Sequence, residues 1–250
     1  MTTTVGTYGR FCNQFIRNIA VSILAKKYNL KVTYMHTDEM ATLGIPLYSG
    51  SNSYLGSTPL NDVNYMHYYN DLNPLYKNFS MTGHTYFQTR QISNIIHNYL
   101  KSPEIRDTII GANKFRGRYN NNEDIFIHIR LGDVANYNPG VGYYDKVIKM
   151  LLSKNPANIF ISSDDIDHIT CKILLAKYRI ATPIQYNHIE TLQFASTCKY
   201  IILSHGSFSA TIGNLAFYSE VYYPKYDPRK IWYGDMFTGL GWKEIPHLIY

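Results

Sequence analysis

Short apolar runs alternate with stretches of helical periodicity in the C-terminal half of the chain, and this pattern constrains the fold most. Asp124-Ile-Phe-Ile-His-Ile-Arg130 is almost continuously apolar between its polar ends, which is typical of a strand buried on both faces. The alternation predicts a parallel sheet with helices on both faces. Further strands are expected at 158–162, 199–204 and 221–223, and helices at 143–152, 166–177, 190–197 and 207–217.

The N-terminal half begins with the pattern of a strand, a helix and a second strand. A short Thr/Val strand runs into Gly9, and one broad apolar face predicts a helix over residues 12–28. Lys31–Met35 predicts the second strand of this βαβ unit. We also expect a strand at 84–87 and a helix at 91–100.

Other stretches of the chain are less regular. Residues 41–80, rich in Gly, Ser, Asn, Pro and Tyr, show no assignable pattern. The polar segment Asn113–Glu123 is the best candidate for a linker. The expected organisation is therefore an N-terminal α/β domain of residues 1–115 and a C-terminal Rossmann-like domain of residues 120–250.

Composition excludes several classes of protein. The chain has 250 residues, of which 45% are hydrophobic and 17% charged, so it is globular rather than disordered, fibrous or disulfide-rich. Its formal net charge is +6, from 24 Lys and Arg against 18 Asp and Glu. No Lys/Arg run or nucleic-acid-binding motif accompanies this charge. We therefore expect no nucleic-acid partner, although the charge would attract a small polyphosphate.

The cysteines and the N-terminus indicate the cellular compartment in which the protein is expected. Cys12, Cys171 and Cys198 have no metal-ligand spacing and suggest no disulfide framework, which favours a reducing compartment. The N-terminus lacks the basic and apolar regions of a signal peptide, and no apolar run approaches the ~18 residues of a membrane span. We expect a soluble cytoplasmic protein, and its Asn-, Ile-, Tyr- and Lys-rich composition suits a bacterial or viral source.

The segment His128-Ile-Arg130-Leu-Gly-Asp133 is the sharpest candidate for a site. His128 and Arg130 fall on one face of a buried strand at its carboxyl end, where open α/β sheets bind ligands. A planar guanidinium there can grip a pyrophosphate with two hydrogen bonds. The alternative is a structural ion pair between Arg130 and Asp133.

A second candidate follows the strand expected at 199–204. Gly206 allows close approach to the backbone, and Ser207 is suited to the N-cap of the next helix. The N–H groups of that helix start, at Ser207–Ser209, can receive a phosphate. Ordinary helix capping is the alternative.

Two further turns carry polar groups. Arg10, Asn13 and Gln14 place a cation and two amides at the first strand-to-helix turn, where they suit an anion or sugar hydroxyls, although such turns are more often simply capped. Asp165 and Asp167 form a DxD pattern, which holds a divalent cation in metal-dependent glycosyltransferases. Capping of the next helix explains these carboxylates equally well.

In their order along the chain, these motifs resemble the α-1,2-fucosyltransferases of glycosyltransferase family 11. They share features with the wider superfamily that includes α-1,6- and protein O-fucosyltransferases. Two positions depart from the family pattern: Leu131 replaces the second Arg of HxRRxD, and Ala210-Thr211 stand where a tryptophan pair is common. The resemblance rests on Gly9-Arg-Phe-Cys-Asn-Gln14, Thr85-Tyr-Phe-Gln88 (like GYFQS or GYWQS), His128–Asp133 (like HxRRxD), Tyr143-Tyr144, Ser162–Asp165 and Ser204–Ser209 (like NSTFS).

This resemblance implies an α/β, GT-B-like enzyme with two Rossmann-like halves that face a central cleft, the acceptor on the N-terminal side. The implied reaction moves L-fucose from GDP-fucose to a hydroxyl of a glycan acceptor, with α-1,2 linkage and inversion, and without a metal or other cofactor. The alternatives are a metal-dependent GT-A-type glycosyltransferase using Asp165 and Asp167, or a non-catalytic nucleotide-sugar-binding module.

The resemblance also implies roles for single residues. His128 and Glu190 match superfamily residues that contact the guanosine, and the Glu190 carboxylate can accept from guanine N1–H and N2–H2 unless it merely caps its helix. Asp133 or a residue of 41–90 is the candidate general base. We therefore expect Arg130, Asp133, Asn13 and Arg10 to act in catalysis, and His128, Arg130, Asp164, Glu190, Gly206, Ser207, Phe208, Ser209 and Gln14 to bind the donor.

Overall fold

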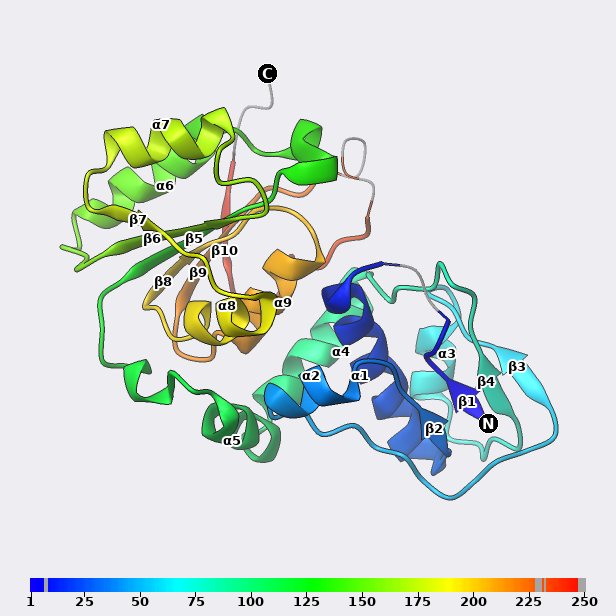
Figure 1. Cartoon of the computed structure of the whole chain (residues 1–250). Coiled ribbons are helices and arrows are strands. Elements are labelled where there is room, and N and C mark those ends of the chain that lie inside the picture. Colours follow the sequence, from blue (N-terminus) through cyan, green and yellow to red (C-terminus); the bar gives the residue numbers. More distant parts are fainter. Residues whose placement is uncertain (7–8, 228–230, 232, 247–250) are drawn as a thin grey trace. The chain divides into compact units, whose positions relative to one another are not determined.

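A computed structural model of the chain describes residues 1–6, 9–227, 231 and 233–246 (Figure 1). The chain forms two compact units. Unit 1 consists of Met1–Ile109 with Gly234–Met236, and unit 2 consists of Ile110–Tyr233 with Phe237–Tyr250.

Unit 2 is built, in its described residues, on a six-stranded sheet in which all paired neighbours run parallel. The strand order is β10-β9-β8-β5-β6-β7. The α/β class expected from the sequence is therefore confirmed. The strands are β5 (Ile125–Ile129), β6 (Ile159–Ser163), β7 (Ala181–Pro183), β8 (Tyr200–Ile202), β9 (Glu220–Pro224) and β10 (Lys243–Ile245).

Helices cover both faces of this sheet, α6 (Val141–Leu152) and α7 (Ile169–Lys177) on one side and α8 (His188–Ala195) and α9 (Ser207–Leu215) on the other (Figure 1). The side chains of β5 alternate between the two faces, as the period of a strand requires. Ile125, Ile127 and Ile129 join the buried cluster of α6 and α7. Phe126 packs near Phe194 of α8, with ring centres 6.5 Å apart.

The strand order reverses at β5, and this reversal places a binding position. From β5 the chain builds β6 and β7 outward on one side, then returns to add β8, β9 and β10 on the other. The helices that follow β5 and β8 therefore leave on opposite faces of the sheet (Figure 1). Open α/β sheets bind their ligands at such a switch point.

Most elements of unit 2 agree with the sequence prediction. The apolar runs became β5, β6, β8 and β9, and the four helical stretches became α6 to α9 within a few residues. The prediction missed β7 and β10. Each is three residues long and mostly exposed or partly exposed, so neither has the apolar run that identified the other strands.

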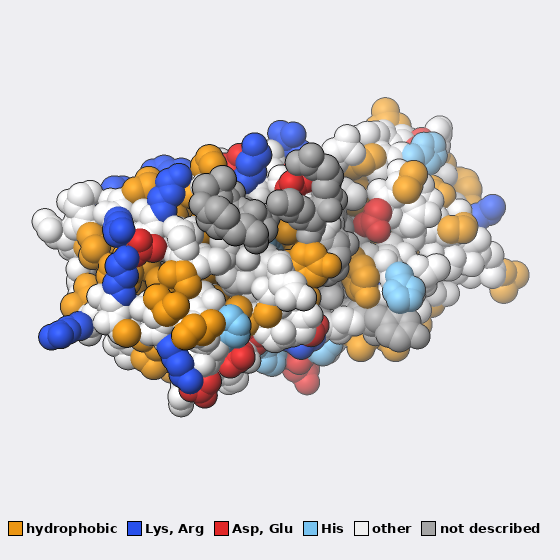
Figure 2. Space-filling view, turned by 90° about the horizontal axis from the view of Figure 1, so that it is seen from above, with side chains coloured by type: hydrophobic (Ala, Val, Ile, Leu, Met, Phe, Trp, Pro, Cys, Tyr) orange, Lys and Arg blue, Asp and Glu red, His pale blue; other side chains and the backbone are white. Residues whose placement is uncertain are grey.

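Charged side chains on the α6 and α7 side of unit 2 are scattered among other residues rather than gathered in one patch (Figure 2). Several of them are paired: the Asp145 carboxylate of α6 lies 2.8 Å from Lys149 Nζ and 2.6 Å from Lys177 Nζ. None of the described helices is long and apolar enough to cross a membrane.

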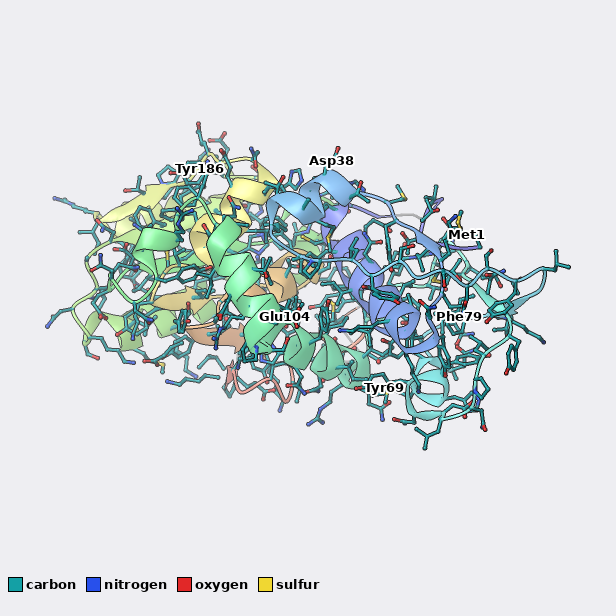
Figure 3. All side chains as sticks on the ribbon, turned by 90° about the horizontal axis from the view of Figure 1, so that it is seen from below. Met1, Asp38, Tyr69, Phe79, Glu104 and Tyr186 are labelled. Atoms are coloured by element: carbon teal, nitrogen blue, oxygen red, sulfur yellow. The ribbon has the colours of Figure 1, made fainter. Side chains whose placement is uncertain are left out.

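Unit 1 contains the expected βαβ unit, in which β1 (Thr2–Thr3) and β2 (Val32–Thr33) pair in parallel around α1 (Phe11–Tyr28). A second parallel pair joins β3 (Ser57–Pro59) to β4 (Asn78–Ser80), and Phe79 of β4 packs against the ring of Tyr28 (Figure 3). The other helices are α2 (Thr37–Thr42), α3 (Tyr65–Asn70), α4 (Arg90–Lys101) and α5 (Pro103–Ala112).

The strand expected at 84–87 is wrong, because this segment is an irregular turn. Phe87 has φ +56°, a left-handed conformation that an extended strand cannot include, and its side chain is fully buried. Arg17 of α1 donates from Nη1 to the carbonyls of Thr82 and Thr85, both at 3.1 Å. The buried guanidinium thus forms hydrogen bonds with two backbone carbonyls that, in a strand, would accept from a neighbouring strand.

The segment 113–123 is not a flexible linker, as its polar composition suggested, but part of unit 2. Asn113 is buried, and its Nδ2 donates to the Gln193 carbonyl at 2.9 Å. Asn122 Nδ2 donates to the Thr197 carbonyl at 2.9 Å. These side-chain amides satisfy backbone carbonyls at the end of α8, so the polar residues are used for packing rather than for solvation.

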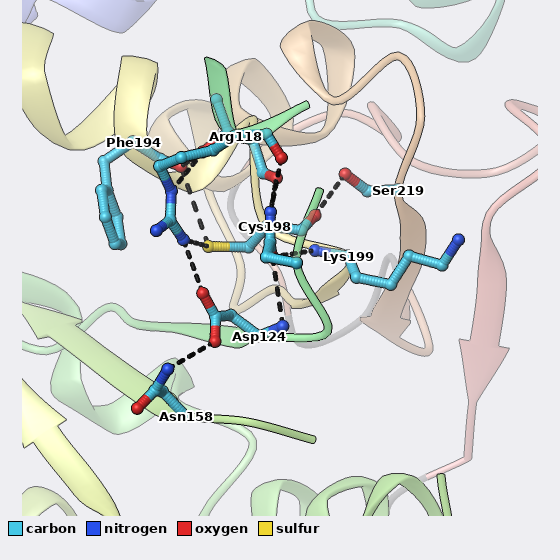
Figure 4. Close-up of polar contacts among 9 residues, drawn as sticks. Arg118, Asp124, Asn158, Phe194, Cys198, Lys199 and Ser219 are labelled. Carbon is cyan, nitrogen blue, oxygen red and sulfur yellow. Dashed lines mark hydrogen bonds and ion pairs between the residues drawn. The ribbon is translucent and has the colours of Figure 1, made fainter. Parts of the chain in front are cut away.

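Arg118, in the short 3-10 helix Arg116–Arg118, anchors this segment beside the start of β5 (Figure 4). Its Nη2 donates to Asp124 Oδ2 at 2.7 Å, and its Nε donates to Thr197 Oγ1 at 3.1 Å. The guanidinium carbon lies 4.4 Å from the centre of the Phe194 ring. Asp124 is 2% exposed and also accepts from Asn158 Nδ2 at 2.8 Å. This ion pair is therefore a buried clamp at the amino end of β5.

Replacing Arg118 by Met should destabilise unit 2. The variant keeps an apolar stem against Phe194 but leaves the buried Asp124 carboxylate without its cation, which typically costs about 3 kcal/mol of unfolding free energy. Urea denaturation followed by circular dichroism measures the loss. The matched control is Lys172→Met, which breaks a surface pair with Asp167 and should leave the midpoint nearly unchanged. A wild-type midpoint for Arg118→Met would show that the clamp adds no net stability.

Candidate active site

Polar groups follow three adjacent strands of unit 2 at the carboxyl edge of the sheet. Arg130 follows β5, Asp164 follows β6, and Gly206 stands between β8 and α9. Since β6 and β8 flank β5, the three positions lie around the switch point. We call this group, with His128, Asp133 and Ser207–Ser209, the carboxyl-edge cluster.

Arg130 is held between two carboxylates in the carboxyl-edge cluster. Its guanidinium forms ion pairs with Asp164 and with Asp133, and its side chain is 16% exposed. Asp164 Oδ1 also accepts from the backbone N–H of Leu131 at 2.8 Å, which ties this carboxylate to the loop that follows β5. Asp133 is more loosely placed, with its side chain 64% exposed. Asp164 is thus the anchor of the guanidinium, and Asp133 is its solvent-facing partner.

Gly132 makes room for the ion pair between Arg130 and Asp164. A Cβ at this position would lie 2.6 Å from Asp164 Oδ2 and 3.2 Å from Arg130 Nη1. Its φ of +40° is also one that residues with a side chain rarely adopt. The sequence motif contained this glycine, but only the structure reveals the close approach that requires it.

His128 lies inside the fold on the face of β5 opposite α6. Its Nδ1 is 2.6 Å from Ser209 Oγ, and its ring lies 4.9 Å from the Phe208 ring. Ser209 Oγ also accepts from the Ser204 N–H at 3.0 Å. Burial, together with the nearby Arg130 charge, lowers the pKa of His128 from 6.5 to about 3. The imidazole is therefore neutral near pH 7 and joins β5 to the start of α9.

The N-cap of α9 is Gly206, not Ser207 as the sequence suggested. Gly206 has φ +95° and ψ 169°, and as a glycine it supplies no side-chain oxygen to the first N–H groups of the helix. Apart from its neighbours along the chain, no described residue has an atom within 4 Å of the position that its Cβ would occupy. The helix therefore begins beside open space, where an anion can reach the backbone amides of Ser207–Ser209.

Asn138 was missed by the sequence analysis although it supports the loop after Arg130. Its Nδ2 donates to the Arg130 carbonyl at 2.9 Å and to the Tyr144 hydroxyl at 3.1 Å. The neighbouring Tyr143 hydroxyl donates to the Leu203 carbonyl at 2.8 Å, just after β8. The paired tyrosines of α6 thus brace the ends of both central strands. The Asn-Pro-Gly sequence at 138–140 signalled a turn but not this contact.

In unit 1 the structure brings together two motifs that lie far apart in the sequence. Gln88 Nε2 donates to Asn13 Oδ1 at 2.8 Å, which joins the turn of 85–88 to the first turn of α1. Arg10 is the N-cap residue of α1, and Gln14 is buried within the helix. Gly9 has φ +97°, and a Cβ there would lie 2.3 Å from Asn13 Nδ2. Gly9 is therefore required for the position of Asn13.

Behind this turn of unit 1 lie a buried arginine, Arg17, and a half-buried aspartate, Asp62. Arg17 is 1% exposed, and burial lowers its pKa to about 10 while Asp62 and Tyr86 act to raise it. Burial raises the pKa of Asp62, and the backbone N–H groups of Tyr86, Phe87 and Gln88 partly oppose that rise. The Asp62 carboxylate therefore faces the turn that carries Gln88, and no sequence motif identified it.

Glu190 lies in the first turn of α8, where Asn187 is the N-cap and accepts from the Glu190 N–H at 2.9 Å. The Glu190 carboxylate forms an ion pair with Lys114 and also accepts from the backbone N–H of Asn187, so it takes part in capping its helix as well. This pair lowers the pKa of Glu190. No described contact joins Glu190 to the carboxyl-edge cluster.

The DxD pair is not gathered into a metal site. Asp167 pairs with Lys172 at 3.5 Å and is 87% exposed, and the Asp165 N–H donates to Ser163 Oγ at 3.1 Å. Within residues 1–6, 9–227, 231 and 233–246, no group of three or more His, Cys, Asp or Glu side chains is placed to hold a metal ion.

Comparisons with known proteins give distant structural similarity. No protein-family model matches the sequence, and no curated protein matches it. The chain is similar to POFUT1 in complex with GDP, with 13% identity, a TM-score of 0.41 and coverage of 85% of this chain and 94% of that one. POFUT1 in complex with GDP-fucose gives 11% identity and a TM-score of 0.38, over 85% of this chain and 93% of that one.

The chain is also similar to NodZ, an α-1,6-fucosyltransferase soaked with GDP-fucose. Identity is 10% and the TM-score is 0.36, over 62% of this chain and 57% of that one.

His128 should make unit 2 less stable in acid. Unfolded histidine takes up a proton near pH 6.5, whereas folded His128 remains neutral until about pH 3. The unfolded state then binds more protons, so the free energy of unfolding falls as pH decreases from about 6.5 toward 3. His128→Asn removes the titrating imidazole and therefore removes its contribution to the pH dependence of stability. The stability of wild type minus variant, from urea unfolding at pH 7.5, 6 and 5, should therefore fall with pH. A difference independent of pH would contradict the low pKa.

Proposed function

We propose that this protein is a metal-independent, inverting glycosyltransferase that moves L-fucose from GDP-fucose to a hydroxyl of a glycan acceptor, with an α-1,2 linkage. The observation that carries the proposal is Arg130, which follows β5 at the switch point of the sheet and is held there by Asp164. The adjacent strand, β8, leads into the open start of α9. The order of the fucosyltransferase-like motifs along the chain supports the choice of donor.

The charges of the reaction match the groups of the carboxyl-edge cluster. As GDP leaves fucose, positive charge develops on the sugar ring and negative charge on the β-phosphate. Fixed donors can stabilise the phosphate charge. Arg130 can offer two N–H groups, and the amides of Ser207–Ser209 add the positive end of α9. Asp164 keeps the guanidinium in place before the donor arrives.

Binding of the donor requires Arg130 to exchange a partner. Both of its described carboxylate partners carry negative charge, and a pyrophosphate would replace one of them. Asp133 is the one that leaves in our proposal, because its side chain is 64% exposed whereas that of Asp164 is 26% exposed. Asp164 therefore acts as a positioning residue for Arg130 rather than as a direct ligand of GDP.

The guanosine is assigned to His128 and Glu190. The neutral imidazole of His128 can hydrogen-bond the nucleoside without adding charge, and the Glu190 carboxylate can accept from guanine N1–H and N2–H2. Arg10 and Asn13 of unit 1 are assigned to catalysis, with Arg10 as a further donor to the phosphates, and Gln14 is assigned to donor binding. Gln88 braces the turn that carries Asn13. Asp133, once released from Arg130, is our candidate for the general base.

A non-catalytic nucleotide-sugar-binding module is the second candidate function. The ion pairs of Arg130 with two carboxylates favour it, since they satisfy the guanidinium without any ligand. Such a module would bind GDP but give no transfer to any acceptor.

Arg130→Ala should reduce turnover of GDP-fucose by about 100-fold or more, the loss expected for about 3 kcal/mol of transition-state stabilisation. The measurement is release of GDP from GDP-fucose with and without an acceptor panel. Asn138→Ala is the comparison variant, because it loosens the Arg130 loop without removing the cation and should cost less. Unchanged turnover in Arg130→Ala would assign a purely structural role to this residue.

Turnover should persist in EDTA, because the proposed phosphate donors are Arg130 and backbone amides. Transfer assayed in chelated buffer, and again with added Mn²⁺, tests this directly. Complete loss in EDTA that Mn²⁺ restores would contradict the proposal and favour a metal held by Asp165 and Asp167.

A further inference from the structure

Lys114 forms an ion pair with Glu190, although 76 residues separate them in the sequence. Lys114 lies two residues after the end of α5, and Glu190 lies in the first turn of α8. The Lys114 side chain is 46% exposed and that of Glu190 is 33% exposed. An ammonium and a carboxylate therefore stand side by side at the surface of unit 2, where an incoming ligand can reach both.

Aromatic rings accompany this charge pair. Lys114 Nζ lies 4.9 Å from the centre of the Phe115 ring and 5.7 Å from that of Tyr186. The two rings are 5.6 Å apart, and Tyr186 is 43% exposed at the surface in front of α8 (Figure 3). Phe194 supports both rings from inside, at 5.3 Å from Phe115 and 5.5 Å from Tyr186. A purine ring can stack on such a supported, half-exposed aromatic surface.

We propose that Lys114 is a specificity-determining residue that reads O6 of the guanine while Glu190 reads N1–H and N2–H2. This inference rests on the proposed function, which assigns Glu190 to the base but gives Lys114 no role. An ammonium donates and a carboxylate accepts, so the pair presents a donor beside an acceptor. The matching edge of a ligand has an acceptor beside a donor, and guanine O6 and N1–H are adjacent ring positions of that kind.

Adenine presents the opposite polarity at the same positions. Its 6-amino group would face the Lys114 ammonium, and its unprotonated N1 would face the Glu190 carboxylate. Both contacts would be repulsive if the phosphates fixed the orientation of the base. The ammonium and the carboxylate can also stay near each other while both bind guanine, because O6 and N1 are neighbours. The pair thus keeps both charges compensated before and after binding.

The test compares Lys114→Met with wild type by calorimetry using GDP, IDP and ADP. IDP keeps O6 and N1–H but lacks the 2-amino group. The dissociation constants of GDP and IDP should both increase about tenfold, as expected for one lost hydrogen bond to a charged group. The dissociation constant of ADP should stay the same or decrease, because a repulsive ammonium is gone. Discrimination between GDP and ADP should therefore fall.

Glu190→Gln and Lys149→Met complete the design. Glu190→Gln should weaken GDP more than IDP, because only GDP carries the 2-amino group. Lys149→Met removes another surface lysine of unit 2 that is ion-paired, here with Asp145, and should leave all three affinities unchanged.

Two outcomes would overturn the role of Lys114. Unchanged GDP affinity in Lys114→Met would make the pair a surface ion pair only. A loss larger for GDP than for IDP would mean that Lys114 acts by orienting Glu190 and does not contact O6. Failure of the proposed GDP site has a different result, since the wild-type protein would then bind neither GDP nor IDP, whereas a non-catalytic module would still bind GDP and would fail only in the transfer assay.

Discussion

One-sided burial of the isoleucines of β5 is the constraint on which unit 2 depends. Ile125, Ile127 and Ile129 pack into the core beneath α6, so the intervening side chains must point to the other face. Because helices cover both faces of the sheet and β6 and β8 flank β5, all five residues of this strand are buried (Figure 1). A polar group can appear only where it is hydrogen-bonded inside, as His128 is, or beyond the strand end, as Arg130 is. The geometry of the sheet thereby confines its chemistry to one edge.

Electrostatics at that edge favours a cation that is ordered before a ligand arrives. Asp164 binds both the Arg130 guanidinium and the Leu131 N–H, so one carboxylate fixes the side chain and the loop together. A guanidinium held in this way loses less conformational freedom when it binds an anion. Such preorganised donors stabilise charge more effectively than mobile ones. The two carboxylates compensate the charge of the arginine, and in the proposed function a pyrophosphate would take the place of one of them.

The sequence was sufficient to predict the strands and helices whose apolar residues follow a regular pattern of burial. The apolar runs of β5, β6 and β8 and the turn after each strand could be predicted. The positions of Arg130 and Gly206 beyond the carboxyl ends of their strands could be predicted as well. No single segment of the sequence determines the order of the strands in the sheet, so the ion pair between Arg130 and Asp164 could not be predicted. Asn13 and Gln88, or Lys114 and Glu190, meet across about 75 residues through packing that local patterns do not encode. The segment 84–87 was predicted as a strand because nothing in its own residues indicates the hydrogen bond from the buried Arg17 side chain to the Thr85 carbonyl.

The clamp of Arg118 and Asp124 lies at the opposite end of the same strand from Arg130. The stabilising ion pair and the proposed ligand site therefore lie at opposite ends of β5, with the five residues of the strand between Asp124 and Arg130. A protein built in this way can tolerate replacement of its ligand-facing groups, since the ion pair that secures the strand remains untouched. Over evolutionary time, such a sheet could exchange one nucleotide or sugar for another by changing a handful of edge residues, while its amino end preserves the fold.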